Sequence, residues 1–93
     1  MRLVITDEAA RDFEHIGDVI ARDNPTRAKS FVRELNAACE SLLVFPRRFL
    51  LVGKRSGTHK MTHGNYLIYY RVTGDIVEVL SVRHAARRQP RFR

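Results

Sequence analysis

The chain of 93 residues has little cysteine, no long apolar run and few acidic residues in its second half. Cys39 is the only cysteine, which excludes an internal disulfide and a zinc site built on several thiolates. No apolar run approaches the roughly 20 residues that span a membrane. Asp7 and Glu8 leave no room for the apolar core of a signal peptide before them. We therefore expect a cytoplasmic protein with no membrane partner.

The shortage of acidic residues is confined to the part of the chain beyond residue 40. Residues 1–40 hold six Lys or Arg against eight Asp or Glu, a net charge of −2. Residues 41–93 hold eleven against two, a net charge of +9. Such a basic half predicts a polyanionic or acidic partner, either nucleic acid or an acidic protein segment. The length supports one domain over 1–93, in which 87–93 form a basic C-terminal tail.

The last third of the chain predicts a β-hairpin. Two β-branched and aromatic runs, 66–72 and 76–83, flank Thr73-Gly74-Asp75. Glycine accepts the positive φ that a two-residue hairpin turn requires. With Thr73 opposite Ile76, the expected register pairs Arg71 with Glu78, Tyr70 with Val79, Tyr69 with Leu80 and Leu67 with Val82.

This register divides the hairpin into two faces. One face is apolar and needs a covering layer, and it carries Tyr66, Ile68, Tyr70, Val72, Val77 and Val79. The other face mixes apolar, aromatic and charged side chains, which a core does not ordinarily choose, and it carries Leu67, Tyr69, Arg71, Glu78, Leu80 and Val82. We expect a function of the sheet to lie on this second face.

Two amphipathic helices are predicted before the hairpin. Thr6 provides a capping hydroxyl for the first helix, whose apolar residues recur at helical spacing as far as Ile20. Asn24 is the expected cap of the second helix, because Pro25 suits the first helical position. The apolar stripe of that helix consists of Ala28, Phe31, Val32, Leu35, Ala38, Cys39 and Leu42, and it ends near Phe45-Pro46. The two helices form an antiparallel hairpin.

Further strands complete the prediction. Residues 2–5 and 58–63 are strand candidates, and Gly64-Asn65 offers a second two-residue turn. The run 49–52 is either a strand or a packed loop. We therefore expect an α+β fold in the order β-α-α-β-β-β, with the helix hairpin packed on one face of a small, mainly antiparallel sheet.

This order of elements, Asn24-Pro25, the strand 66–72 and the exit His84-Ala85-Ala86-Arg87 together resemble the RelE/ParE superfamily of toxins, on the ParE (plasmid stabilisation) branch. The resemblance covers nearly the whole chain. It implies a toxin of a type II toxin–antitoxin system, bound in a hetero-oligomer by a cognate ParD-like antitoxin of the ribbon-helix-helix class. ParE toxins are known for poisoning DNA gyrase, whereas RelE toxins cleave messenger RNA within the ribosome.

The resemblance also separates the two branches. RelE-type nucleases usually carry an arginine where this chain has Leu67, and a basic, His or Tyr side chain about where it has Ala85. Lys60 matches one lysine of such enzymes, and Thr58 replaces another. Leucine and alanine side chains neither stabilise a phosphorane nor protonate a leaving oxygen. No catalytic residue is therefore favoured. The residues that remain for a ribonuclease are Lys60, Arg71 and His84.

Basic and aromatic residues near the hairpin exit are the candidate target-binding residues. They are Tyr69, Arg71, Arg83, His84, Arg87, Arg88 and Arg91. For two of them, the sequence is consistent with two different roles. Arg71 either grips a phosphate or pairs with Glu78, and His84 is either a general acid or a cap for backbone groups at the strand end.

His59 and His63 share one strand, but no cysteine or nearby carboxylate completes a coordination shell, so neither a metal nor a cofactor is predicted. The leading prediction is a toxin that inhibits DNA gyrase by direct protein binding. The alternatives are a ribosome-dependent mRNA endoribonuclease, with the ribosome and mRNA as partners, and a non-catalytic nucleic-acid-binding module.

Overall fold

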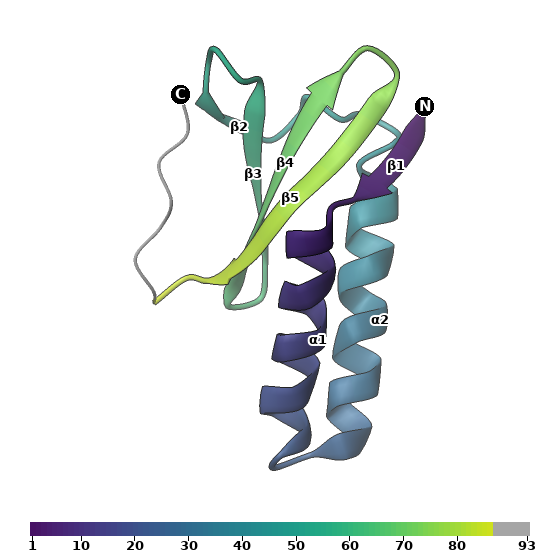
Figure 1. Ribbon diagram of the computed structural model, residues 1–93, viewed down its shortest axis with the longest axis vertical. Helices are drawn as coiled ribbons and strands as arrows, with labels where there is room; N and C mark the ends of the chain where they lie inside the picture. Colours follow the sequence, from purple (N-terminus) through teal and green to yellow (C-terminus); the bar gives the residue numbers. More distant parts are fainter. Residues whose placement is uncertain (87–93) are drawn as a thin grey trace.

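In the computed structural model, residues 1–86 are described and form two helices and a five-stranded sheet. The elements are β1 (Arg2–Ile5), α1 (Asp7–Ala21), α2 (Pro25–Ser41), β2 (Leu50–Gly53), β3 (Thr58–His63), β4 (Tyr66–Thr73) and β5 (Ile76–His84). The strand order is β1-β5-β4-β3-β2, in which β1 pairs with β5 in parallel and the other pairings are antiparallel. Figure 1 shows α1 and α2 side by side as an antiparallel hairpin.

The predicted α+β fold is confirmed, with one strand more than the predicted order contained. The run 49–52, which the sequence left open, contributes β2 at the edge of the sheet. The second helix ends at Ser41, a turn earlier than its apolar stripe indicated. No helix within residues 1–86 is long and apolar enough to cross a membrane.

Both helices begin at the side-chain caps that the sequence predicts. The Thr6 hydroxyl accepts a hydrogen bond from the Ala9 N–H at 3.1 Å. The Asn24 side-chain oxygen accepts one from the Arg27 N–H at 3.0 Å, and Pro25 occupies the first helical position. Each cap satisfies a backbone donor that the first helical turn leaves without a partner, which typically stabilises a helix by about 1 kcal/mol.

The two hairpin turns also form where predicted. Gly64 and Gly74 each occupy the first loop position, with φ of 58° and 57°. This left-handed backbone is costly for residues with a Cβ atom, so glycine fixes the position of both turns. The register of β3 and β4 agrees with the prediction, since Lys60 lies opposite Tyr69 and Met61 lies opposite Ile68.

The predicted register of β4 and β5 is right near the turn and wrong beyond it. Arg71 lies opposite Glu78 and Tyr70 lies opposite Val79. Tyr69 then lies opposite Ser81 instead of Leu80, and Leu67 lies opposite Arg83 instead of Val82. A β-bulge causes the shift, because β5 contains one residue more than β4 does in this stretch.

The bulge coincides with the end of β1. The Thr6 hydroxyl donates to the carbonyls of both Val79 and Leu80, at 2.8 and 3.1 Å. Successive carbonyls of a regular strand point to opposite sides, so an irregular backbone is needed to turn both toward one hydroxyl. As a result Val82, predicted on the second face, lies in the core and is 3% exposed.

The core fills the space between the helix hairpin and one face of the sheet. The buried cluster consists of Ala9, Phe13, Ile16, Phe31, Leu35, Cys39, Leu42, Met61, Ile68, Tyr70, Val72, Val77, Val79 and Val82. Apart from Val82, the sheet residues in it belong to the face predicted to be covered. Burial of the Cys39 thiol raises its pKa to about 12, so the side chain acts as a small hydrophobe, as predicted.

Candidate partner-binding surface

Three of the predicted cationic residues share the face of the sheet that points away from the helices, here called the outer face. Cross-strand rows place Lys60 beside Tyr69 and Ser81, Thr58 beside Arg71 and Glu78, and Thr62 beside Leu67 and Arg83. Side chains in such rows are near neighbours, so the fold brings Lys60, Arg71 and Arg83 onto one surface.

Arg71 is paired with Glu78, as one of the two sequence interpretations held. Its Nε and Nη2 atoms donate to the Glu78 Oε1 atom at 3.1 and 2.5 Å. Both side chains are partly exposed, and a pair of this kind typically contributes on the order of 0–1 kcal/mol. The pair holds the guanidinium in place and neutralises much of the charge that it presents to an anion.

Tyr69 lies on the predicted face but is buried there. The residue is 2% exposed. Burial raises the pKa of its hydroxyl, and the nearby positive charge of Arg83 opposes that rise. Stacking of a nucleic-acid base requires an open ring face. Tyr69 therefore supports its neighbours on the outer face and offers no stacking surface in this conformation.

His84 lies on the opposite side of the sheet from Lys60 and Arg71. It pairs with Tyr66 at the end of β5, and their rings meet edge to face with centroids 5.1 Å apart. Its Nδ1 atom accepts a hydrogen bond from the Ala86 N–H at 3.0 Å, which is the backbone-capping role. The three residues available to a ribonuclease are thus divided between two faces of the sheet.

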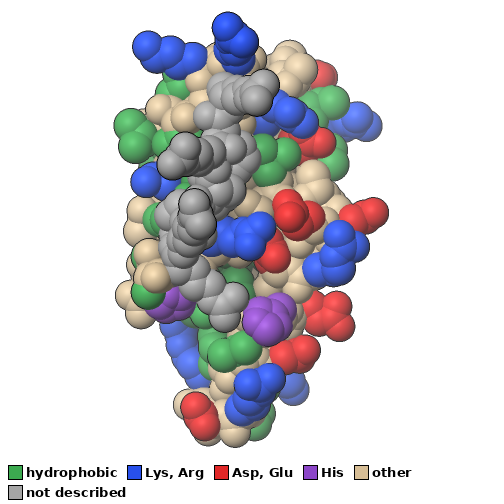
Figure 2. All heavy atoms as spheres, turned by 60° about the vertical axis from the view of Figure 1, so that its left-hand side comes forward, with side chains coloured by type: hydrophobic (Ala, Val, Ile, Leu, Met, Phe, Trp, Pro, Cys, Tyr) green, Lys and Arg blue, Asp and Glu red, His purple; other side chains and the backbone are tan. Residues whose placement is uncertain are grey.

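A cleft of about 320 Å³ lies between α1 and the end of β5. Its lining consists of Asp12, His15, Ile16, Val19, Tyr66, Val82, Arg83, His84 and Ala86. Figure 2 shows acidic and basic side chains intermixed on the side of the molecule that carries α1. The cleft therefore presents both signs of charge, with two histidines at its wall.

Two carboxylates of α1 organise this cleft. Asp12 accepts a hydrogen bond from the Val82 N–H at 2.8 Å, and Glu8 lies 3.5 Å from Arg83 Nη2. Neither contact was predicted from the sequence. Asp12 interrupts an apolar stripe that includes Ala9, Phe13 and Ile16, and a carboxylate at such a position is the signal that could have revealed a buried partner.

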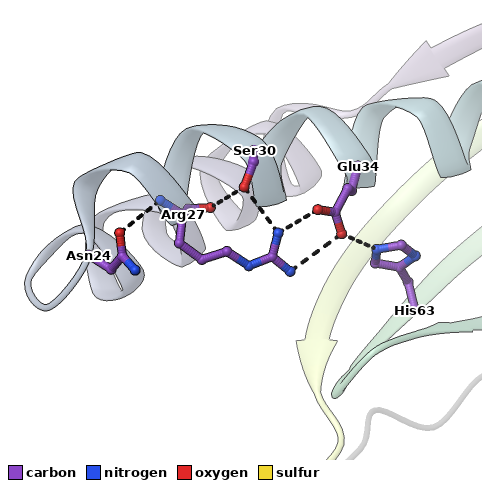
Figure 3. A network of polar contacts seen from close by, with 5 residues as sticks. All are labelled: Asn24, Arg27, Ser30, Glu34 and His63. Carbon is purple, nitrogen blue, oxygen red and sulfur yellow. Dashed lines mark hydrogen bonds and ion pairs between the residues drawn. The ribbon is translucent and has the colours of Figure 1, made fainter.

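A second polar network links α2 to the β3–β4 turn (Figure 3). Arg27 donates to Ser30 at 3.0 Å and forms an ion pair with Glu34. The Glu34 Oε1 atom in turn lies 3.5 Å from His63 Nε2, so His63 has a carboxylate neighbour that was not predicted from the sequence. Within residues 1–86, no three His, Cys, Asp or Glu side chains gather closely enough to hold a metal ion.

Part of the predicted target-binding set lies beyond the described residues. Arg87, Arg88 and Arg91, with the rest of the predicted tail 87–93, fall outside residues 1–86. The described part of the set comprises Tyr69, Arg71, Arg83 and His84. The first three share the outer face, and His84 lies on the other side of the sheet. Among residues 1–86, the fold therefore brings Lys60, Arg71 and Arg83 to the outer face and places His84 on the other side of the sheet.

These features define a class of protein, a small basic α+β domain with a helix hairpin against a five-stranded sheet. A family model described as the ParE toxin of type II toxin–antitoxin system, parDE, matches residues 3–89. The chain belongs to this ParE toxin family, which confirms the resemblance and its branch.

Solved structures agree on the fold. The chromosomal ParDE TA system from P. aeruginosa contains a chain with 22% sequence identity and a TM-score of 0.78. The match covers 90% of the present chain and 95% of the other. No curated protein sequence matches this chain. At this identity the structural likeness shows a shared fold, and the family model carries the assignment as a toxin of a type II toxin–antitoxin system.

Proposed function

We propose that this ParE-family toxin inhibits DNA gyrase by binding it directly, in the cytoplasm and without a reaction of its own. We further propose that a ParD-like ribbon-helix-helix antitoxin neutralises it in a hetero-oligomer. One observation supports the proposal most strongly: Lys60 and Arg71 lie on the outer face of the sheet, whereas His84 lies on the opposite face.

Cleavage of RNA by its own 2′-hydroxyl needs a base, an acid and a cation around one phosphate, all within hydrogen-bond reach of the reacting oxygens. Lys60 and Arg71 supply only cations from the outer face, and Arg71 is engaged by Glu78. His84 would have to act from the other face, where its Nδ1 atom already accepts from Ala86. This geometry favours binding over catalysis.

The proposed gyrase contacts lie on the outer face of the sheet, at the end of β5 and in the tail that follows it. Arg83 joins the outer face to the α1 cleft, since it shares a row with Leu67 and also lines the cleft. We assign the contact to Arg71, Arg83 and His84, with Tyr69 buried beside them in a supporting role, and to Arg87, Arg88 and Arg91 of the tail. Family membership supports gyrase as the kind of target.

A binding measurement tests the proposal. Purified toxin should bind immobilised gyrase in the absence of DNA, and Arg83→Glu should weaken that binding by about tenfold or more, because a contact of about 1.4 kcal/mol is lost or made repulsive. Arg22→Glu, on the exposed end of the helix hairpin, is the matched charge-reversal control. Salt-sensitive binding to bare DNA or RNA without binding to gyrase would favour the nucleic-acid-binding alternative.

A further inference from the structure

Exposed apolar side chains gather in one short stretch of the chain, between α2 and the end of β2. Val44 is 67% exposed, Phe45 66%, Leu50 62% and Leu51 44%. Large apolar residues with this exposure are common singly, but four of them within the eight residues 44–51 make this stretch a candidate partner-binding surface. We call Val44, Phe45, Leu50 and Leu51 the β2 patch.

The β2 patch lies on a free edge of the sheet. Among the elements of residues 1–86, β2 is the last strand in the order and pairs only with β3. Leu50 shares a row with Lys60 and so belongs to the outer face, whereas Leu51 shares a row with His59 and belongs to the helix-facing side. The edge therefore exposes a leucine on each face, as well as backbone groups that another strand can pair with.

The loop before β2 is hydrogen-bonded to the core and can therefore form part of a binding surface. The Tyr70 hydroxyl donates to the Pro46 carbonyl at 2.6 Å, which ties this loop to the core. Phe45, Pro46, Arg47 and Arg48 line a shallow hollow of about 370 Å³. An apolar side chain from a partner has a site there, between Phe45 and the stems of two arginines.

Charge specifies the kind of partner. Residues 41–74 contain six basic residues and no Asp or Glu, and these residues are Arg47, Arg48, Lys54, Arg55, Lys60 and Arg71. Four of the six lie immediately before or after β2. A second copy of this chain would bring the same positive charges together, which costs free energy, whereas an acidic segment would complement them.

The other edge of the sheet does not fit an acidic partner. β1 is also an edge strand, and Val4 is 37% exposed. Asp7 and Glu8 follow this strand after Thr6, and a backbone hydrogen bond from the Arg2 N–H to the Asp75 carbonyl places the Asp75 residue beside the start of β1. Acidic side chains near β1 would repel an acidic segment, so the two edges differ in the partner that they select.

We infer that β2 receives an extended segment of the antitoxin, rich in both acidic and apolar residues, which pairs with the edge and adds one strand to the sheet. This inference rests on the antitoxin of the proposed function. The pairing is short, because β2 has four residues and its register shifts between Leu51 and Gly53. Side chains on the two faces of the added strand would cover Leu50 and Leu51.

Hydrogen exchange followed by mass spectrometry tests the inference on the toxin alone and in its complex with the antitoxin encoded beside it. Backbone amides of 50–53 should exchange about tenfold more slowly or better in the complex, because the edge gains hydrogen bonds. Leu50→Asp should weaken the complex by about tenfold or more, since it places a carboxylate against an acidic segment. Val4→Asp is the matched control on the other edge, and it should leave the affinity nearly unchanged.

Each other outcome overturns the inference. A complex with unchanged exchange in 50–53 means that the antitoxin binds elsewhere, and the gyrase proposal then stands unaffected. Slowed exchange in the toxin alone, with a doubled mass in light scattering, means that a second copy covers β2. If no complex forms with the antitoxin, both this inference and the antitoxin part of the proposed function fail. The wild-type exchange pattern decides the question even if Leu50→Asp does not fold.

Discussion

The Asp12 carboxylate accepts a hydrogen bond from the backbone N–H of Val82 at 2.8 Å, across a sequence separation of 70 residues. β1 pairs with β5 only as far as Val79, so the Val82 N–H lies on a stretch of edge along which residues 1–86 place no neighbouring strand. A side chain of α1 takes the place of that strand. This contact joins the helix hairpin to the end of β5, beside Arg83 and His84.

Asp12→Ala should destabilise the fold by about 1–3 kcal/mol, because the Val82 N–H loses a charged acceptor in a partly buried place. Asp12→Asn should lose less, since its amide oxygen can still accept the bond. Urea denaturation followed by circular dichroism measures the difference. Asp18→Ala, on an exposed part of the same helix, is the control and should change the free energy of unfolding little. Equal losses for Asp12→Ala and Asp18→Ala would contradict this role.

The pH dependence of stability should include Glu34. Its hydrogen bond from Arg27 lowers the pKa of the Glu34 carboxyl below the ordinary value of 4.5. A lowered carboxyl pKa stabilises the fold above the unfolded value, and this contribution is lost as the pH falls through the folded value. The melting temperature of the wild-type protein should therefore fall more steeply below pH 4.5 than that of Glu34→Gln. Parallel curves would show that the network in Figure 3 does not persist in solution.

Cys39 should resist alkylation in the folded protein. The thiol is 0% exposed, and burial raises its pKa to about 12, so almost no thiolate is present near pH 8. Iodoacetamide should label the native chain very slowly and the urea-unfolded chain at the rate of a free cysteine. Mass spectrometry at timed intervals measures both rates. Rapid labelling of the native chain would mean that α2 opens readily from the sheet.

The parts of the fold that follow from local patterns could be predicted from the sequence. Thr6, Asn24 and the two turn glycines act on backbone groups a few residues away, so their effects are visible in the chain itself. The bulge in β5 could not be predicted in this way. It depends on Thr6, which is more than 70 residues distant in sequence, meeting two carbonyls of the strand.

In the candidate site too, some features could be predicted from local patterns and others could not. The pairing of Arg71 with Glu78 follows from a hairpin register that the turn fixes, and the structure contains it. The placement of Leu67 opposite Arg83 depends on the bulge, and the Asp12 contact depends on the packing of α1 against β5. A one-residue shift moves every later side chain to the other face, so a small error in register changed the predicted surface.

Supercoiling of relaxed plasmid by purified gyrase, with the toxin added in increasing amounts, tests the central claim most directly. We predict that the wild-type toxin inhibits supercoiling, that prior mixing with the antitoxin restores it, and that Lys60→Ala inhibits as well as the wild type because no reaction of the toxin is involved. Primer extension on translated mRNA should show no new cuts. Unaffected supercoiling at excess toxin, with codon-phased mRNA cuts that disappear in His84→Ala, would contradict the account.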